Sequence, residues 1–312
     1  VISVGQPVCG PNVQNFSHTY SEYLFRNIEN HIIPCGENVA NMAGTYYNCS
    51  FYDAIAPTIV IGPNVIDASY CFYNCKNLDN TYVPNLPDNL LNMAFIFQNT
   101  GIKGEAKCPN NVVNIVNAYC NCNITKVACS NNVINMTGAY SGCQFLTEAI
   151  CESNVVNMDN TYNNCHNLIT AVCGDNVINM SYTYRSCTNL IEAVCGPNVA
   201  DMSGAYKTCI NITKVICGLN VVNMDNTYNS CINIIEAICG PNVTNMDSTY
   251  YHCTNLVNAI GGPNVSSMKG TYGECPKIHG NFYINSNNIR YFDNCFYNRN
   301  NQNQLNIYVY SN

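Results

Sequence analysis

Cysteine is the residue type in this chain that could do the most chemistry, because its thiolate can bind metals, form disulfides or act as a nucleophile. The chain has 22 Cys. Most of them fall at two positions of a repeating unit. One series is Cys129, Cys151, Cys173, Cys195, Cys217 and Cys239, and the other is Cys143, Cys165, Cys187, Cys209, Cys231, Cys253 and Cys275. Cysteine metal sites usually combine a C-x₂₋₄-C pair with a second pair nearby. Cys71/Cys75 and Cys120/Cys122 approach this spacing without a clear second pair, so we predict no metal site.

The two series are best interpreted as ladders of buried thiols that pack as small apolar side chains. Disulfides between neighbouring repeats are the alternative. Stacked strands lie about 4.8 Å apart, but their parallel side chains give poor geometry for a bridge. Thiols that stay reduced would indicate a reducing or anoxic environment.

Other residues that often catalyse reactions show no constellation. The five His residues occupy unrelated repeat positions, and no Ser/His/Asp order or paired-carboxylate motif occurs. The recurrent Cys-Gly-Pro-Asn turns lack the Lys-Ser/Thr of a phosphate-binding loop. We therefore predict that the chain is not an enzyme and needs no cofactor. The irregular stretch Tyr82–Cys108 is the one place left for an unrecognised site.

These residues are positioned by a repeat that covers nearly the whole chain. All nine Met residues occupy one position of it, and seven recur every 22 residues, at Met136, Met158, Met180, Met202, Met224, Met246 and Met268. An apolar anchor recurs about thirteen times between Val13 and Ile289, at spacings of 21 to 26 residues. Such periods are typical of solenoids, in which each coil packs on its neighbours. We divide the chain into longer, irregular repeats (1–124), regular 22-residue repeats (125–275) and degenerate repeats (276–312).

The unit also fits the leucine-rich frame L-x-x-L-x-L-x-x-N, for example with Leu190, Ala193, Cys195 and Asn198. This frame predicts parallel strands on a concave wall, with Asn198 buried in the following turn, where it bonds to backbone groups of adjacent coils. The Met-x-x-Thr/Ala-Tyr-x-x-Cys segment spaces its apolar residues by three and four, which predicts a short helical or 3₁₀ stretch on the convex wall. The expected fold is a right-handed α/β solenoid, mainly β, of about thirteen coils.

The segment Asn-Val-Thr-Asn-Met-Asp-Ser-Thr-Tyr-Tyr-His-Cys-Thr-Asn-Leu (242–256) resembles the BspA-like leucine-rich repeat family, whose repeats read V-T-N-M-x-x-M-F-x-x-C-x-x-L. Thr/Ala-Tyr replaces the Met-Phe of that family, and the unit is trimmed to 22 residues with an added Cys-Gly-Pro turn. Members are mostly surface proteins of bacteria, of some mucosal protozoa and of phages. The resemblance therefore implies adhesion or recognition without specifying a ligand.

The strand wall carries the residues that we expect to bind a partner. Its central outward position is aliphatic in six successive repeats: Ile150, Val172, Val194, Ile216, Ile238 and Ile260. A neighbouring outward position carries Ile169, Ile191, Ile235 and Val257, and between the two runs a charged line of Lys126, Glu148, Glu192, Lys214 and Glu236. Exposed apolar surface of this kind suggests a protein contact or self-association. Simple β-propensity, cover by another part of the same protein, and a sugar ligand are the alternatives.

The Tyr column could instead be a stacking platform for a ligand, but its place beside the Met column favours core packing, with the phenols reaching water at the rim. Its members in the regular repeats are Tyr140, Tyr162, Tyr184, Tyr206, Tyr228, Tyr250 and Tyr272.

Composition limits the function further. Only 10% of residues are charged and the net charge is −7, which argues against nucleic-acid binding. No apolar run approaches the roughly 20 residues of a membrane span. The start at Val1 indicates a processed or partial chain, and both ends look like uncapped strands that further domains or a partner would cover. We expect an adhesion or recognition scaffold that is extracellular or at the cell surface. The alternative is a phage or virion structural protein, such as a tail fibre or capsid appendage, on a virion surface.

Overall fold

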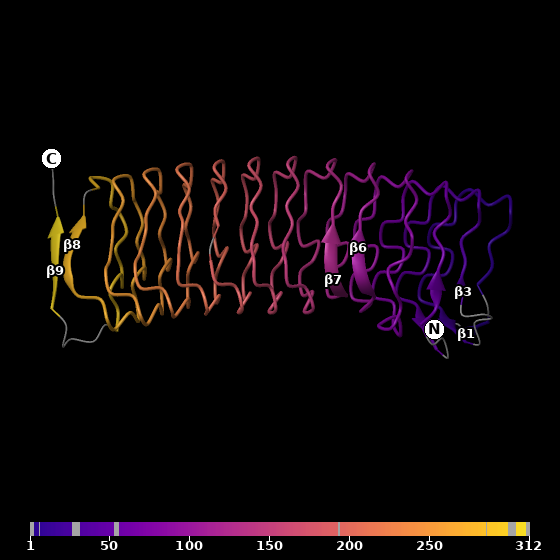
Figure 1. Cartoon of the computed structure of the whole chain (residues 1–312), viewed down its shortest axis with the longest axis horizontal. Helices are drawn as coiled ribbons and strands as arrows, with labels where there is room; N and C mark the ends of the chain where they lie inside the picture. Colours follow the sequence, from indigo (N-terminus) through magenta and orange to yellow (C-terminus); the bar gives the residue numbers. More distant parts are fainter. Residues whose placement is uncertain are drawn as a thin grey trace. The chain divides into compact units, whose positions relative to one another are not determined.

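The structure is a computed structural model that describes residues 3–5, 7–26, 32–52, 56–192, 194–284, 286–298 and 304–309. It divides into two compact units, Val1–Val155 and Val156–Asn312. Each unit is a β-solenoid whose coils follow one another along the chain (Figure 1). The predicted divisions at residues 124 and 275 concern repeat length and remain a prediction.

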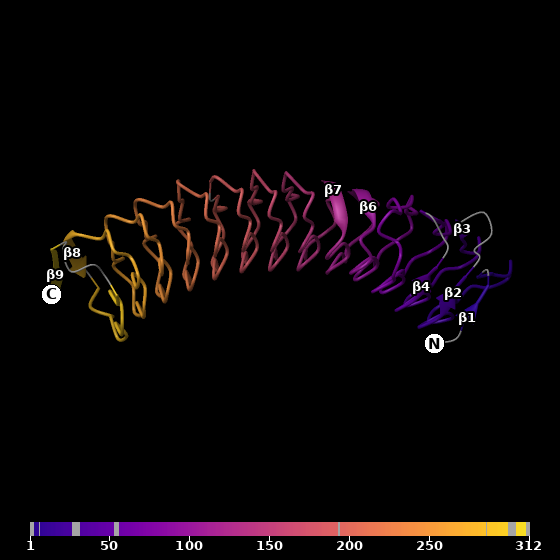
Figure 2. The same ribbon diagram turned by 90° about the horizontal axis from the view of Figure 1, so that it is seen from below.

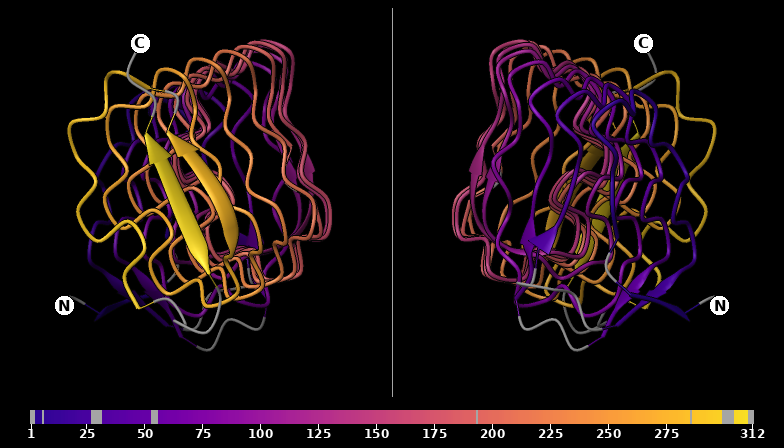
Figure 3. Two further views of the ribbon diagram at one scale, coloured as in Figure 1. Left: turned by 90° about the vertical axis from the view of Figure 1, so that its left-hand side faces the viewer. Right: turned by 90° about the vertical axis from the view of Figure 1, so that its right-hand side faces the viewer.

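All strand pairs are parallel, because each coil returns the chain to the same wall in the same direction. In the first unit the paired sets are β1 (Ser3–Val4) with β2 (Leu24–Phe25) and β4 (Ser50–Phe51), β3 (Ile32–Ile33) with β5 (Thr58–Ile59), and β6 (Lys103–Lys107) with β7 (Asn123–Ala128). In the second unit β8 (Gly280–Ile284) pairs with β9 (Leu305–Val309), and Figure 3 shows this pair side by side.

Isolated parallel bridges join equivalent residues of successive coils. They close five turns between Asn15 and Asn135 in the first unit and six between Asn157 and Tyr291 in the second, about 11 in all. Bridged residues are 21 to 26 positions apart. The predicted number of about thirteen therefore counted copies of the repeat rather than turns.

The wall formed by the Met-x-x-Thr-Tyr-x-x-Cys segments, which we call the turn wall, consists of consecutive turns. The described residues contain no helix. Met158 N–H donates to Asn179 O of the next coil (2.8 Å), whereas Thr161 N–H donates back to Met158 O (3.0 Å). Alternate amides thus bond to the next coil and to the residue three positions back, and a positive φ at Asn160 and Asn164 reverses the chain each time. The prediction of a helical or 3₁₀ stretch was wrong.

The opposite wall, which carries the predicted strands and which we call the strand wall, is more sparsely bonded in the second unit. Isolated contacts such as Thr213 N to Ile191 O (3.2 Å) and Val257 N to Ile235 O (3.0 Å) join its coils there. In Figure 2 the coils of this unit, from pink to yellow, are spread further apart along the edge that carries β8 than along the opposite edge. The strand wall is therefore on the outer side of this unit, not on the concave side that we predicted, because the turn wall holds the coils together more tightly.

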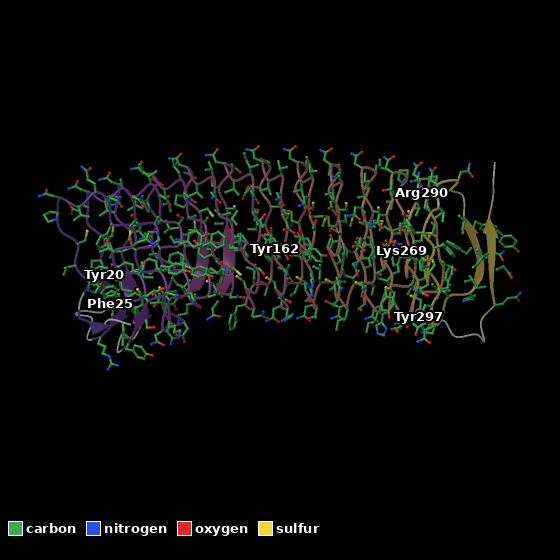
Figure 4. All side chains as sticks on the ribbon, turned by 180° about the vertical axis from the view of Figure 1, so that it is seen from behind. Tyr20, Phe25, Tyr162, Lys269, Arg290 and Tyr297 are labelled. Carbon is green, nitrogen blue, oxygen red and sulfur yellow. The ribbon has the colours of Figure 1, made fainter. Side chains whose placement is uncertain are left out.

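The core is built from columns of identical side chains. In one coil Val199, Met202, Tyr206 and Cys209 are all fully buried, and their equivalents in the neighbouring coils are buried too. Tyr162, labelled in Figure 4, stacks on Tyr184 with ring centroids 5.8 Å apart. The predicted core role of the Tyr column is confirmed.

The turn that leaves the strand wall is also tied to its neighbour. The Asn198 side-chain amide donates to Asp175 O of the preceding coil at 2.8 Å. This agrees with the bonding that we predicted, but Asn198 is exposed rather than buried.

The glycine of this turn has a steric origin. A Cβ atom placed on Gly262 would lie 2.6 Å from Cys239 Sγ of the preceding coil. We expect Gly262→Ala to lower the free energy of unfolding by about 1–3 kcal/mol, the usual cost of overpacking. In urea unfolding, the addition of Cys239→Ala should recover most of that loss, because it removes the clashing sulfur. A double variant whose loss equals the sum of the two single losses would contradict this origin.

Candidate functional site

The strand wall of the second unit presents two rows of aliphatic side chains to solvent, which we call the apolar rows. In the first row Ile169, Ile191 and Ile235 are 49–55% exposed, and Val257 is half-buried. In the second row Val172, Ile216 and Ile260 are 39–44% exposed, and Val194 and Ile238 are half-buried. The two rows run through the same coils of this unit, and the exposed Thr213 interrupts the first row between Ile191 and Ile235.

The backbone beneath the second row is fixed from the core. The Tyr184 hydroxyl donates to Val172 O (2.7 Å), the Tyr228 hydroxyl to Ile216 O (3.1 Å), and the Tyr250 hydroxyl to Ile238 O (2.7 Å). Tyr206 and Tyr272 make the same bond to Val194 O and Ile260 O. The phenols therefore end on strand-wall carbonyls, and the prediction that they reach water at the rim was wrong. Since each carbonyl has its partner inside the protein, the rows are held in place before any partner binds.

The charged line runs between the two rows. Lys214 Nζ lies 3.5 Å from Glu192 Oε1, with both side chains more than half exposed. Glu236 follows in the next coil, and its backbone forms a bridge with Asn258 of the coil after that. An exposed ion pair of this kind contributes little to stability, typically 0–1 kcal/mol. Its charges remain available to orient a partner.

The remaining predicted site residues belong to the first unit. On its strand wall Glu148 is exposed and Ile150 is half-buried. An apolar surface that continues through six coils from Ile150 to Ile260 therefore stays a prediction.

The two cysteine series differ in burial. The second series is buried, and its thiols donate to carbonyls of the Tyr column, as in Cys209 Sγ to Tyr184 O (2.9 Å) and Cys231 Sγ to Tyr206 O (3.0 Å). The first series is half-buried, so the prediction of two buried ladders was wrong for it. The sulfur atoms of four members lie close to the glycine of the next coil, namely Cys173, Cys195, Cys217 and Cys239. Burial still raises the pKa of Cys195 to about 11 and that of Cys239 to about 12.

These environments predict the outcome of a thiol titration. Without reductant, nearly all 22 Cys should react in denaturant, because the S–H groups that donate to carbonyls are reduced. The folded protein should react slowly near neutral pH, because burial and a raised pKa keep the thiolate fraction small. A count near zero in denaturant would contradict this assignment and favour disulfides.

Within the described residues, no group of three or more His, Cys, Asp or Glu side chains could hold a metal ion. The same part of the chain has no helix that is long and apolar enough to cross a membrane.

Comparisons with known proteins agree with this architecture. A family model for the BspA type leucine rich repeat region matches residues 17–117, 66–191, 116–225 and 181–303. A leucine-rich repeat protein from Bacteroides ovatus has a similar structure at 16% identity, with a TM-score of 0.66 over 98% of this chain and 92% of that chain. This likeness shows a shared fold. A search of curated proteins gave no match.

Two more distant structures are also similar to the chain. One is a leucine-rich cell surface protein from Faecalibacterium prausnitzii, with 12% identity, a TM-score of 0.44, and coverage of 100% of this chain and 84% of that chain. The other is the pneumococcal vaccine antigen PcpA, with 10% identity, a TM-score of 0.45, and coverage of 96% and 85%.

Proposed function

The chain belongs to the BspA-type leucine-rich repeat family, and we propose that it is a non-enzymatic scaffold that binds a protein or another cell-surface partner. The observation that carries this proposal is the pair of apolar rows on the strand wall of the second unit. Exposed aliphatic side chains that recur at the same two positions of successive coils suggest a contact surface. Glu192, Lys214 and Glu236 lie between the rows, where they would fix the register of the partner.

We further propose an extracellular or cell-surface location, which is the setting that the family implies. A binding wall made of the same coil repeated many times suits this role, since the partner contacts a long surface instead of a single pocket.

The proposal is tested by introducing a negative charge at two apolar sites of the strand wall. Val172→Glu with Ile216→Glu places two carboxylates in the second row, two coils apart. We expect this variant to lose the partners that the immobilised parent captures from surface extracts of cells, as quantified by mass spectrometry. An apolar surface of the partner could contact these positions only by removing water from the carboxylates, which costs free energy.

The chain offers a matched control. Ile178→Glu with Val222→Glu alters two aliphatic side chains of similar exposure in the turns that follow the same two coils. The control should capture the same partners as the parent, and both variants should unfold at the parent's urea concentration within experimental error. Equal capture by all three proteins would exclude the apolar rows as the binding surface.

A further inference from the structure

The strand wall of the first unit contains an opening between two successive coils. The coils are bonded before it, where Lys76 N donates to Cys49 O (2.9 Å), and after it, where Asn89 Nδ2 donates to Pro63 O (3.1 Å). Between these contacts lies a cavity of about 460 Å³, lined by residues 56–61 of one coil and 82–85 of the next. We call this cavity the slot. It lies within the range of about 300–1,000 Å³ that is usual for ligand sites.

One side of the slot is the second edge of β5. In the parallel pair of β3 and β5, Val60 N donates to Ile33 O at 3.0 Å, and Ile33 is in register with Ile59. In a parallel sheet alternate residues direct their amide and carbonyl to opposite neighbours. Thr58 and Val60 therefore bond toward β3, and Ile59 directs its N–H and C=O into the slot.

The other side is the segment 81–84, which bonds away from the slot. Lys103 N donates to Thr81 O (2.8 Å), and Val83 N donates to Lys103 O (2.9 Å). The same alternation directs the N–H and C=O of Tyr82 into the slot. Among the residues that the structure describes, no hydrogen bond joins β5 to this segment. Two strand edges with unused backbone groups thus face each other across the cavity.

We propose that the slot binds a short extended peptide segment of a partner protein, which adds as a strand between β5 and residues 81–84. Unpaired strand edges are templates for such addition, in which backbone hydrogen bonds supply affinity. The β5 side of the slot, residues 58–61, is about 13 Å long at about 3.3 Å per residue, which suits a segment of about four residues.

The side chains beside the slot define the segment that fits. Ile59 and Ile61 are buried on the core side, whereas Thr58, Val60 and Tyr82 are exposed. A bound strand would therefore alternate apolar residues toward the core with polar or β-branched residues toward solvent. This site lies in the other unit from the apolar rows and is independent of the proposed function.

The experiment uses the full chain and an acetylated, fluorescently labelled peptide that carries the Thr58–Ile61 sequence between pairs of lysines, because this sequence has the required alternation. Tyr82→Pro removes the N–H that faces the slot and leaves the bonds of Thr81 and Val83 intact. Tyr82→Ala is the matched control, since it loses the same ring, including its contact with Lys103, but keeps the N–H.

We expect saturable binding to the parent and to Tyr82→Ala with equal affinity in fluorescence anisotropy. Tyr82→Pro should bind about fivefold more weakly, the effect of one lost hydrogen bond. A peptide N-methylated at both isoleucines should not bind the parent, and this arm does not depend on the folding of any variant. Absence of saturable binding up to about 1 mM, or equal binding of the methylated and unmethylated peptides, would overturn the proposal.

Discussion

Replacement of Tyr228 with Ala is expected to lower the free energy of unfolding by about 3–5 kcal/mol, the usual cost of removing a buried aromatic ring. The ring is fully buried and stacks between Tyr206 and Tyr250, with centroids 5.7 and 5.5 Å away. Its loss leaves a cavity in the column and removes the partner of Ile216 O. Urea unfolding followed by circular dichroism measures the change.

Tyr228→Phe separates the two contributions. It keeps the ring and its stacking but removes the hydroxyl, so Ile216 O loses its hydrogen-bond donor. We expect the free energy of unfolding to fall by about 1–3 kcal/mol, the usual cost of an unsatisfied buried polar group. The Thr or Ala that precedes each Tyr is unchanged in both variants. If the Phe variant were as stable as the parent, the hydroxyl would not be needed to support the strand wall. The replacement of the family's Phe by Tyr would then have no structural role.

Alkaline pH is expected to unfold the protein cooperatively. Burial raises the pKa of Cys49, Cys239 and Cys275 from the ordinary 9.0 to about 12. Below about pH 9 these thiols are protonated in both the folded and the unfolded chain, so stability should not depend on them. Above pH 9 the unfolded chain loses its protons first, and stability falls as pH rises toward 12. Burial also raises the pKa of Tyr228 above its ordinary 10.0, which adds to the loss at higher pH.

The urea midpoint should therefore be constant between about pH 7 and 8.5 and should decrease steeply between about pH 9 and 11. Return to neutral pH under reductant should restore the original midpoint, which separates titration from chemical damage. A midpoint that stays constant through pH 11 would mean that the thiols and phenols are accessible in the folded protein.

The repeat and its core could be predicted from sequence because burial depends on composition at each repeat position. The Met, Tyr and second Cys columns recur without exception in the regular repeats, and such regularity is needed only where every coil packs against the same neighbour. The family resemblance rested on the same columns and is confirmed.

The conformation of the turn wall could not be predicted in this way. Apolar spacings of three and four suit a helix, but two consecutive turns place Met158, Tyr162 and Cys165 on the same buried side. The positions with positive φ carry Asn164, Ser186 and Thr208 in successive coils. Such varied residues give no consistent glycine-like signal, so the sequence contained no clear evidence against a helix.

The exposure of the candidate residues was predictable, but the side of the unit on which they lie was not. The alternation of Leu190 inside and Ile191 outside follows from strand periodicity. The side on which the coils spread apart depends on how many hydrogen bonds each wall makes between coils. That number cannot be predicted from the residue type at any one position. One side of the slot, residues 82–85, begins the irregular stretch Tyr82–Cys108 that was left open for an unrecognised site. The β5 side was not predicted. Pro84, which cannot donate to a ladder, is one signal of this irregularity.

The central claim is that this chain is a recognition scaffold and not a building block of a large particle. Sedimentation of the native material, followed by negative-stain electron microscopy, tests it most directly. We predict a monomer or small oligomer that is released from cell surfaces and still captures partners through the apolar rows. Sedimentation with a very large particle of repeating geometry would contradict the claim and would make the apolar rows an assembly contact of a virion or similar structure.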